Sequence, residues 1–373
     1  MNDYAKPAEG FAPGEYLQDE IDARGWSQLD LAAILGMTPV HVNDLIKGRR
    51  PFTPEIAKAL GAAFGTTAQY WLNLQSAYQL STASKADDEI SRRAEVFGKY
   101  PVRDLVKRTW IVDSSNISVI ETRICEFYGI QHINEEIRIP HAARMSTEYG
   151  RETAMHAAWF ARLKALAPLV SVSSRYSKRK FDNTISDLKR LCEDPNDIRL
   201  VPSTLAKYGI RFVIIEHLPG TKLDGGCIWL PDDSPAIGLS LRYGRMDHFW
   251  FILFHEMFHI GNGDKDCIGV SLYEDSEHGP QKPPQERRAD LAASDALIKR
   301  EFFEDFVNRK GGIYKTEEII GFSIDNHIHP AILVGQIHHR DKNYNKFNKL
   351  MVQIRSIITE TALTDGWGVA LPI

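Results

Sequence analysis

The sequence lacks the features that mark secreted and membrane proteins. Its 373 residues include only four cysteines, Cys125, Cys192, Cys227 and Cys267, and no two of them form a Cys-x-x-Cys pair. This spacing argues against a disulfide framework and a cysteine zinc ribbon, and it favours reduced thiols. The chain has no run of about 18 apolar residues, and its first residues have no apolar core of the kind a signal peptide needs. We therefore expect a cytoplasmic protein without a membrane span.

An excess of charge of one sign is also missing. The 45 basic and 49 acidic residues give a net charge of -4, so any binding to nucleic acid must come from a local patch. The length and the hydrophobic share of 43% are sufficient for two or three domains with ordinary cores.

The pattern along the chain predicts three parts. Residues 1–82 read as short helices with tight turns, which indicates an all-α domain. Residues 83–200 form a helical linker and middle region that contains a basic loop, SSRYSKRK. Residues 201–373 form an α+β domain: β-rich runs up to Tyr243 predict a small antiparallel sheet. Helices are expected afterwards at 245–260, 284–300, 315–323, 329–339 and 343–359.

Two helices near the N-terminus have the spacing of a helix-turn-helix. Ser27 is a good N-cap for QLDLAAIL, in which Leu29, Ala32, Ala33 and Leu35 are expected to face inward. Gly36 ends this helix, and Thr38 caps the next one, PVHVNDLIKG. Such a pair places its second helix in a major groove of DNA.

The outward face of this motif supplies the candidate DNA contacts. Basic residues at the end of the second helix suit phosphates, and the helix face suits base edges. The alternative is a solvated face with an incidental basic run. The candidates are Gln28, Thr38, Val40, His41, Asn43, Asp44, Lys47, Arg49 and Arg50.

A second motif lies in HFWFILFHEMFHIG. His255 and His259 are one helical turn apart, so both imidazoles can bind one Zn²⁺ ion, and Glu256 is placed to act as the catalytic base on a zinc-activated water. The helix is apolar nearly all round and should be buried, which makes unpartnered polar side chains costly.

The third zinc ligand must come from elsewhere. Glu286, in the downstream helix PQERRADLAASDALIKR, is the preferred candidate, and Asp290 one turn later can orient a histidine from behind. Four residues of the intervening loop are rivals for the third position: Asp264, Asp266, Cys267 and His278. Near the motif, Cys227 is more simply a core thiol than an inhibitory ligand, and Arg242 and Tyr243 more simply pack than stabilise an oxyanion.

Both halves resemble known families. Residues 13–80, above all FGTTAQYWLNLQSAYQL, resemble HigA-type antitoxins of the Xre helix-turn-helix group. This resemblance implies a homodimer on a palindromic double-stranded DNA operator. Residues 201–340, with HLPGTKLDGGCIWLPDDSPAIGLSLRYGRMDHFWFILFHEMFHI, ERRADLAASDALI and HPAILVGQIHH, resemble the ImmA/IrrE zinc metallopeptidases. That resemblance implies a zincin-like domain that cleaves a protein, often a repressor.

Three hypotheses for function follow. The first is a transcriptional regulator with a zinc-dependent endopeptidase domain that cuts a partner regulator or a toxin-linked protein. The second is a non-cleaving antitoxin and autorepressor whose C-terminal domain only senses or binds. The third is a structural zinc module, which is disfavoured because a structural site fills its fourth position with a protein ligand.

Overall fold

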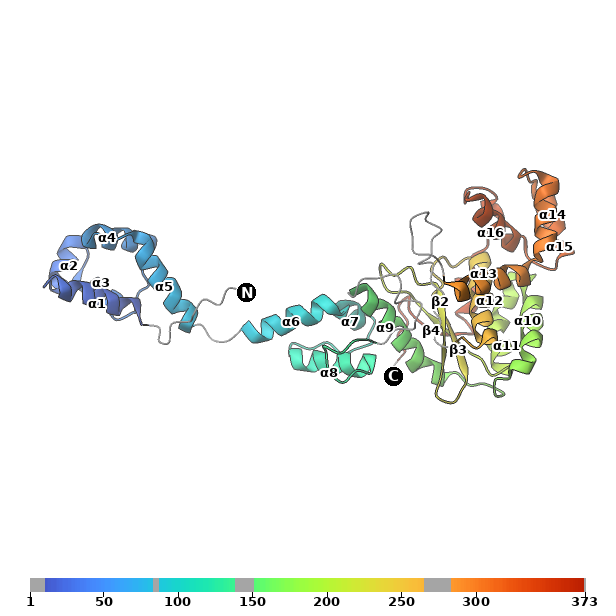
Figure 1. Ribbon diagram of the computed structural model, residues 1–373, viewed down its shortest axis with the longest axis horizontal. Helices are drawn as coiled ribbons and strands as arrows, with labels where there is room; N and C mark the ends of the chain where they lie inside the picture. Colours follow the sequence, from blue (N-terminus) through green and yellow to red (C-terminus); the bar gives the residue numbers. More distant parts are fainter. Residues whose placement is uncertain (1–10, 83–86, 138–150, 265–282, 372–373) are drawn as a thin grey trace. The chain divides into compact units, whose positions relative to one another are not determined.

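The computed structural model describes residues 11–82, 87–137, 151–264 and 283–371. The chain divides into two compact units, Met1–Ser91 and Arg92–Ile373 (Figure 1). Helix α6 (Asp87–Lys99) spans the boundary between them. Each unit has its own hydrophobic core.

The first unit is a bundle of five helices: α1 (Pro13–Ala23), α2 (Gln28–Leu35), α3 (Pro39–Ile46), α4 (Pro54–Phe64) and α5 (Ala68–Thr82). The predicted caps are present. Ser27 Oγ accepts from the backbone N–H of Asp30 at 3.2 Å, and Thr38 Oγ1 accepts from that of His41 at 3.2 Å. Gly36 ends α2 in the left-handed conformation. The turn between α2 and α3 is therefore fixed by local chemistry.

The inward face of α2 differs from the expectation. Leu31 and Ala32 are buried, whereas Leu29 is 65% exposed and Ala33 also faces solvent. The helix is only eight residues long, so a single turn contacts the core and the first apolar residue falls outside it. The core is closed by an aromatic cluster in which Phe52 and Phe64 contact Trp71.

The packing of α1 against α3 depends on Gly14. A Cβ atom at this position would lie 2.0 Å from the backbone oxygen of Ile46. Only glycine allows the two backbones to approach this closely. Gly14 thus allows the start of α1 to pack directly against the end of α3.

The second unit combines eleven further helices with four strands over the described residues. Eight of these elements precede α12, the helix that carries His255 and His259: α7 (Val102–Lys107), α8 (Ile117–Tyr128), α9 (Arg151–Leu166), α10 (Phe181–Lys189), α11 (Val201–Lys207), β1 (Arg211–Ile215), β2 (Gly225–Trp229) and β3 (Pro235–Leu239). The others are α12 (Met246–Asn262), α13 (Pro284–Leu297), α14 (Arg300–Lys310), α15 (Thr316–Asp325), α16 (Pro330–Asp341), α17 (Arg355–Ile358) and β4 (Leu363–Asp365).

The sheet is mixed, and the expectation of an antiparallel sheet is wrong. Its order is β2-β3-β1-β4, with only the β2–β3 pair antiparallel; β1 pairs in parallel with both β3 and β4. The antiparallel pairing of β2 with β3, which follow each other directly in the sequence, agrees with the expectation. The parallel pairs join strands distant in sequence, which turn chemistry alone does not specify.

Helices cover both faces of this sheet. Phe212 and Ile214 of β1 belong to the core that α12 shares, and Val213 and Ile215 belong to the core that α9 shares. Figure 1 shows α9 on one side of the strands and α12 on the other. Burial on both faces explains the continuous apolar run of β1. Residues 92–137 and 151–200 contribute to these two cores.

Two expectations for the C-terminal helices are wrong. The segment 343–359 contains only a 3-10 turn, Asn348–Leu350, and the short α17, while α14 was not expected. Phe347 and Lys342 have positive φ angles, which interrupts a helix there. In the described part of the chain, no single helix is long and apolar enough to cross a membrane. Helices α2 and α3 together reach the required length and hydropathy, but the two are bent by 112° at the turn between them.

Candidate functional site

The first candidate site is the outer face of α2 and α3. Val40 is 69% exposed on the first turn of α3, and His41 and Asn43 are partly exposed beside it. Thr38 caps this helix, and Lys47 ends it on the exposed side. Gln28 begins α2, where its amide lies 3.5 Å from that of Gln18. The predicted contacts therefore share the surface of one helix-turn-helix.

Asp44 has partners that its place in the sequence did not reveal. Its carboxylate lies 3.6 Å from Arg49 Nη1 and 3.7 Å from Arg50 Nε. Its backbone oxygen accepts from the backbone N–H groups of the same two arginines, at 2.8 and 3.2 Å. Both guanidinium groups remain more than half exposed. Asp44 thus holds the arginines at the end of α3 and offsets part of their charge.

The second candidate site is a buried triangle of ligand atoms. His255 Nε2 lies 3.0 Å from His259 Nε2, and Glu286 Oε2 and Oε1 lie 3.1 and 3.3 Å from these two nitrogens. The two histidines come from α12 and the glutamate from the first turn of α13. Together they are the one His/Cys/Asp/Glu group of the described residues whose ligand atoms converge in this way.

The donor set fits a zinc ion. Ligands at tetrahedral zinc, about 2.0–2.2 Å from the metal, lie roughly 3.3 Å from one another, close to the spacings of this triangle. Each histidine also directs its other nitrogen at a carboxylate: His255 Nδ1 lies 2.9 Å from Asp290 Oδ1, and His259 Nδ1 lies 2.9 Å from Asp264 Oδ2. A carboxylate at Nδ1 keeps the proton there and leaves the Nε2 lone pair for a metal.

The electrostatics of the triangle favour a positive charge. Burial by itself lowers the pKa of His255, but hydrogen bonds with Asp290 and Glu286 outweigh it and raise the pKa to about 9. Burial raises the pKa of Glu286, but hydrogen bonds with His255 and His259 outweigh it and lower the pKa to about 2. An anionic carboxylate thus faces two imidazoles in a setting that stabilises a cation.

The proposed catalytic base, the rival ligand Asp264 and Cys227 lie outside the triangle. Glu256 is fully buried on α12, and its charge is among those that raise the pKa of His255. Of the rival ligands, Asp264 contacts the Nδ1 side of His259, away from the triangle. Asp266, Cys267 and His278 lie outside the described residues. Cys227 is buried in the core between the sheet and α12.

The run 236–241 offers no free strand edge. It contains β3, which lies between β2 and β1 and pairs with both. The outer edge of β2 pairs with no strand in the part of the chain that the structure describes. Trp229, the last residue of β2, donates from Nε1 to the backbone oxygen of Asp264 at 3.1 Å. Residues 225–228 of β2 are buried and only Trp229 is partly exposed. The exposed end of this strand therefore lies close to Asp264, the carboxylate at His259 Nδ1.

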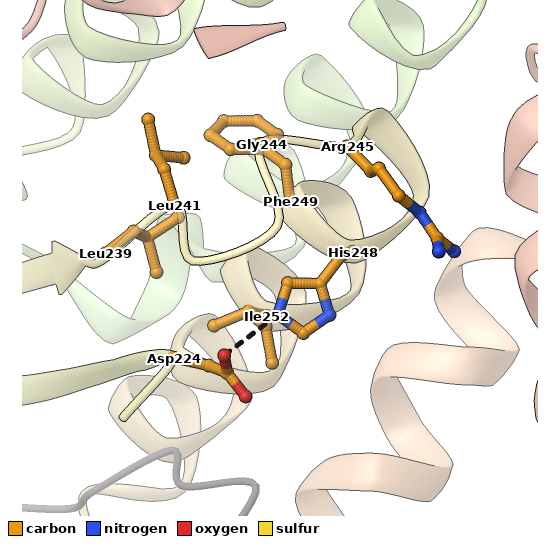
Figure 2. A pocket seen from close by; sticks show the side chains of 8 residues that line it. All are labelled: Asp224, Leu239, Leu241, Gly244, Arg245, His248, Phe249 and Ile252. Carbon is orange, nitrogen blue, oxygen red and sulfur yellow. Dashed lines mark ion pairs between the residues drawn. The ribbon is translucent and has the colours of Figure 1, made fainter. Parts of the chain in front are cut away.

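A small hollow lies further along α12. It has a volume of about 10 Å³, enough for one water molecule. Figure 2 shows His248 and Asp224 facing each other in it. Asp224 also pairs with Arg242 Nε at 3.1 Å, and the Arg242 guanidinium stacks on Tyr243. His248 precedes His255 by two helical turns, so the hollow lies about 10 Å along the same face.

The contact of Asp264 was not considered in the sequence analysis. Asp264 was treated there only as a possible ligand, whereas its carboxylate lies 2.9 Å from Nδ1 of His259. The signal for Asp264 was its place five residues after His259, directly behind the helix end at Gly263. No sequence signal separates β2 from β3 as the edge strand, because strand order depends on β1 and β4.

Comparison with known proteins concerns the first unit. The helix-turn-helix family matches residues 17–71. The chain is 34% identical over 76 residues to the uncharacterized HTH-type transcriptional regulator YddM of Escherichia coli K12, covering 20% of this chain and 81% of that protein. It is 36% identical over 80 residues to virulence-associated protein I of Dichelobacter nodosus, covering 21% of this chain and 74% of that protein.

Solved structures match the same part of the chain. The antitoxin HigA of Pseudomonas aeruginosa, determined with the higBA promoter, is 36% identical and has a TM-score of 0.21, covering 23% of this chain and 94% of its own. An addiction module antidote protein of the HigA family from Coxiella burnetii is 33% identical, with a TM-score of 0.21, covering 23% of this chain and 92% of its own. Through its N-terminal unit, the chain belongs to the helix-turn-helix family of DNA-binding transcriptional regulators.

Proposed function

We propose that the protein is an antitoxin-type transcriptional regulator whose second unit is a zinc-dependent endopeptidase. The observation that supports the second part is the convergence of His255, His259 and Glu286, with a carboxylate behind each histidine. The proposal for the first part is that a homodimer binds a palindromic operator and represses its own promoter. It is supported by the exposed face of α3 and the arginines that follow it.

DNA binding is tested with the double substitution Arg49→Ala/Arg50→Ala in the full chain. Phosphate contacts carry no sequence information, so affinity should fall alike on operator and random DNA. The slope of log K against log salt should flatten by about two, since each lost phosphate contact changes it by about 0.9. Lys58→Ala, an exposed cation on α4, is the control. An unchanged slope in the double variant would refute the assignment.

The chemistry of the second site follows from its residues. A zinc ion held by the triangle supplies a Lewis acid for a peptide carbonyl and lowers the pKa of water. Glu256 follows His255 directly in the chain, and its carboxylate is the candidate that accepts the water's proton and returns it to the leaving nitrogen. Asp264 and Asp290 keep the two imidazoles in the tautomer that can act as ligands.

The substrate is proposed to be a protein partner in an extended conformation. Trp229, at the end of β2, is partly exposed. It is tied to Asp264 and through it to His259. A partner repressor or a protein linked to the cognate toxin could therefore approach the metal centre at this end of β2.

Two variants test the enzyme proposal. Purified wild-type protein should contain one equivalent of zinc, and His259→Ala should lose it. Glu256→Gln should keep both the zinc and the fold but abolish cleavage of the partner in cells that carry the operon. Partner fragments and promoter output are followed together. If wild type and Glu256→Gln behave identically while zinc is bound, the peptidase proposal is refuted.

The second candidate function is a non-cleaving antitoxin whose second unit senses or binds. One observation favours it: His255, His259 and Glu286 are each at most 3% exposed, so the triangle is closed to solvent as it stands. In that case promoter output should respond to zinc in both wild type and Glu256→Gln. A structural zinc module is disfavoured because the described residues supply three ligands, not four.

A further inference from the structure

An exposed valine at the start of α3 has no packing role in the first unit. Val40 is the second residue of this helix and is 69% exposed, whereas Val42 and Leu45 of the same helix are fully buried in the core. Helix formation does not need Val40 either, because a β-branched side chain has a lower helix propensity than alanine or a straight-chain residue. Neither packing nor helix formation therefore accounts for this apolar side chain on the surface.

Val40 also differs from the other residues of the candidate DNA-binding face. Of the nine candidate contacts, it is the only one whose side chain has no charged or hydrogen-bonding group. The other eight can bind a phosphate or the polar edge of a base. A valine side chain can bind neither, so any contribution of Val40 to DNA recognition must come from an apolar contact.

Local chemistry fixes the position of Val40. The hydroxyl of Thr38 accepts from the backbone N–H of His41 at 3.2 Å, and Pro39 occupies the first helical position, where its fixed φ angle suits a helix. A valine in a helix has one strongly preferred χ1 rotamer. The two methyl groups of Val40 are thus held in place before any partner binds, which lowers the entropic cost of an ordered contact.

The major groove of DNA presents one apolar group on its base edges, the C5-methyl group of thymine. In a helix-turn-helix, the N-terminal residues of the second helix contact these edges, and Val40 lies in the first turn of that helix. A valine against guanine, adenine or cytosine would cover a hydrogen-bond donor or acceptor without replacing its bond to water, which is costly. Thymine alone offers a methyl group that the valine can cover without that loss.

We propose that Val40 recognises a thymine of the operator through its methyl group. This inference rests on the proposed function, operator binding by the first unit, and it adds the identity of one base: a thymine faces the start of α3 in each half of the operator. The contact removes two apolar groups from water, which stabilises the complex with thymine. Removing only the methyl group of that base should therefore weaken binding, and this effect should depend on Val40.

The test uses the full chain and replaces thymine with deoxyuridine, which lacks only the methyl group. The operator is first selected from a pool of random duplexes, and each of its thymines is then replaced in turn. At one thymine in each half, the wild-type affinity should fall about fourfold, as expected for the burial of one methyl-sized group. Val40→Ser removes both methyl groups of the valine and should bring the affinity ratio of the two duplexes close to one. Val40→Thr keeps one methyl group and should give an intermediate ratio.

The control is Leu29→Ala, which removes another exposed apolar side chain, on α2, and should keep the wild-type ratio. Because Val40 is exposed, its variants should keep the fold, which circular dichroism checks. A wild-type ratio in Val40→Ser would overturn the inference. So would an operator in which no thymine responds to the loss of its methyl group. If the wild-type protein selects no sequence from the pool, the proposed operator binding is itself refuted, and the inference with it.

Discussion

Removing the Asp264 carboxylate, which lies at His259 Nδ1, should weaken the proposed zinc site without removing a proposed ligand. Asp264 Oδ2 accepts from His259 Nδ1 at 2.9 Å, and His259 is fully buried, so no water replaces the lost acceptor. In Asp264→Ala the proton is free to move to Nε2, and this tautomer cannot bind a metal. Loss of such an outer carboxylate typically costs 10–100-fold in metal affinity, or about 1.4–2.7 kcal/mol.

Asp264→Asn separates geometry from charge. The amide oxygen can still accept from Nδ1, so the tautomer is kept and the loss should be at most about tenfold. Zinc affinity is measured by competition with a chromogenic chelator, with His259→Ala as the ligand-loss reference. Wild-type affinity in Asp264→Ala would refute the assigned role. A complete loss of zinc, equal to that of His259→Ala, would instead make Asp264 a ligand.

Two further predictions concern charge pairs in the two units. Asp44→Asn should raise the affinity for random DNA a few-fold and steepen the slope of log K against log salt by about one, because Arg49 and Arg50 lose their counter-charge. Filter binding at several salt concentrations measures this slope. A loss of affinity confined to operator DNA would instead show that Asp44 contacts a base. Asp365→Ala should destabilise the second unit by about 3–5 kcal/mol, because it leaves the buried Arg162 unpaired. Denaturant unfolding measures the loss, with Glu304→Ala as the control. Glu304 belongs to an exposed ion pair with Arg300, which contributes less than about 1 kcal/mol to the free energy of unfolding. Equal losses in the two variants would contradict the prediction.

Features set by local chemistry were predictable from the sequence. The caps at Ser27 and Thr38 depend on side chains that bond three residues away. The shared face of His255 and His259 follows from helical periodicity alone. Glu286 was chosen because it lies on a downstream helix with Asp290 one turn later, and its two oxygens lie 3.1 and 3.3 Å from the Nε2 atoms of His255 and His259.

Features that depend on distant parts of the chain were not predictable. The clearest case is Asp365, which accepts hydrogen bonds from Trp110 Nε1 at 3.0 Å and Arg162 Nε at 2.8 Å. These residues are more than 200 positions apart, and no local pattern links them. The same reason explains the wrong expectation for the sheet: β1 pairs in parallel with β4, which lies about 150 residues later in the sequence.

One continuous set of contacts joins the end of β2 to the proposed metal ligands. Tyr176 packs on Trp229, Trp229 donates to the backbone of Asp264, and the carboxylate of Asp264 contacts His259. A partner that contacted Trp229 would therefore reach residues that orient a proposed ligand, whether or not it is cut. Under the peptidase proposal, this contact would guide a substrate towards the metal; under the sensor proposal, it would let a bound partner change the metal site. The contact set is common to both proposals, so Glu256, the proposed proton carrier outside it, is the residue whose replacement separates them.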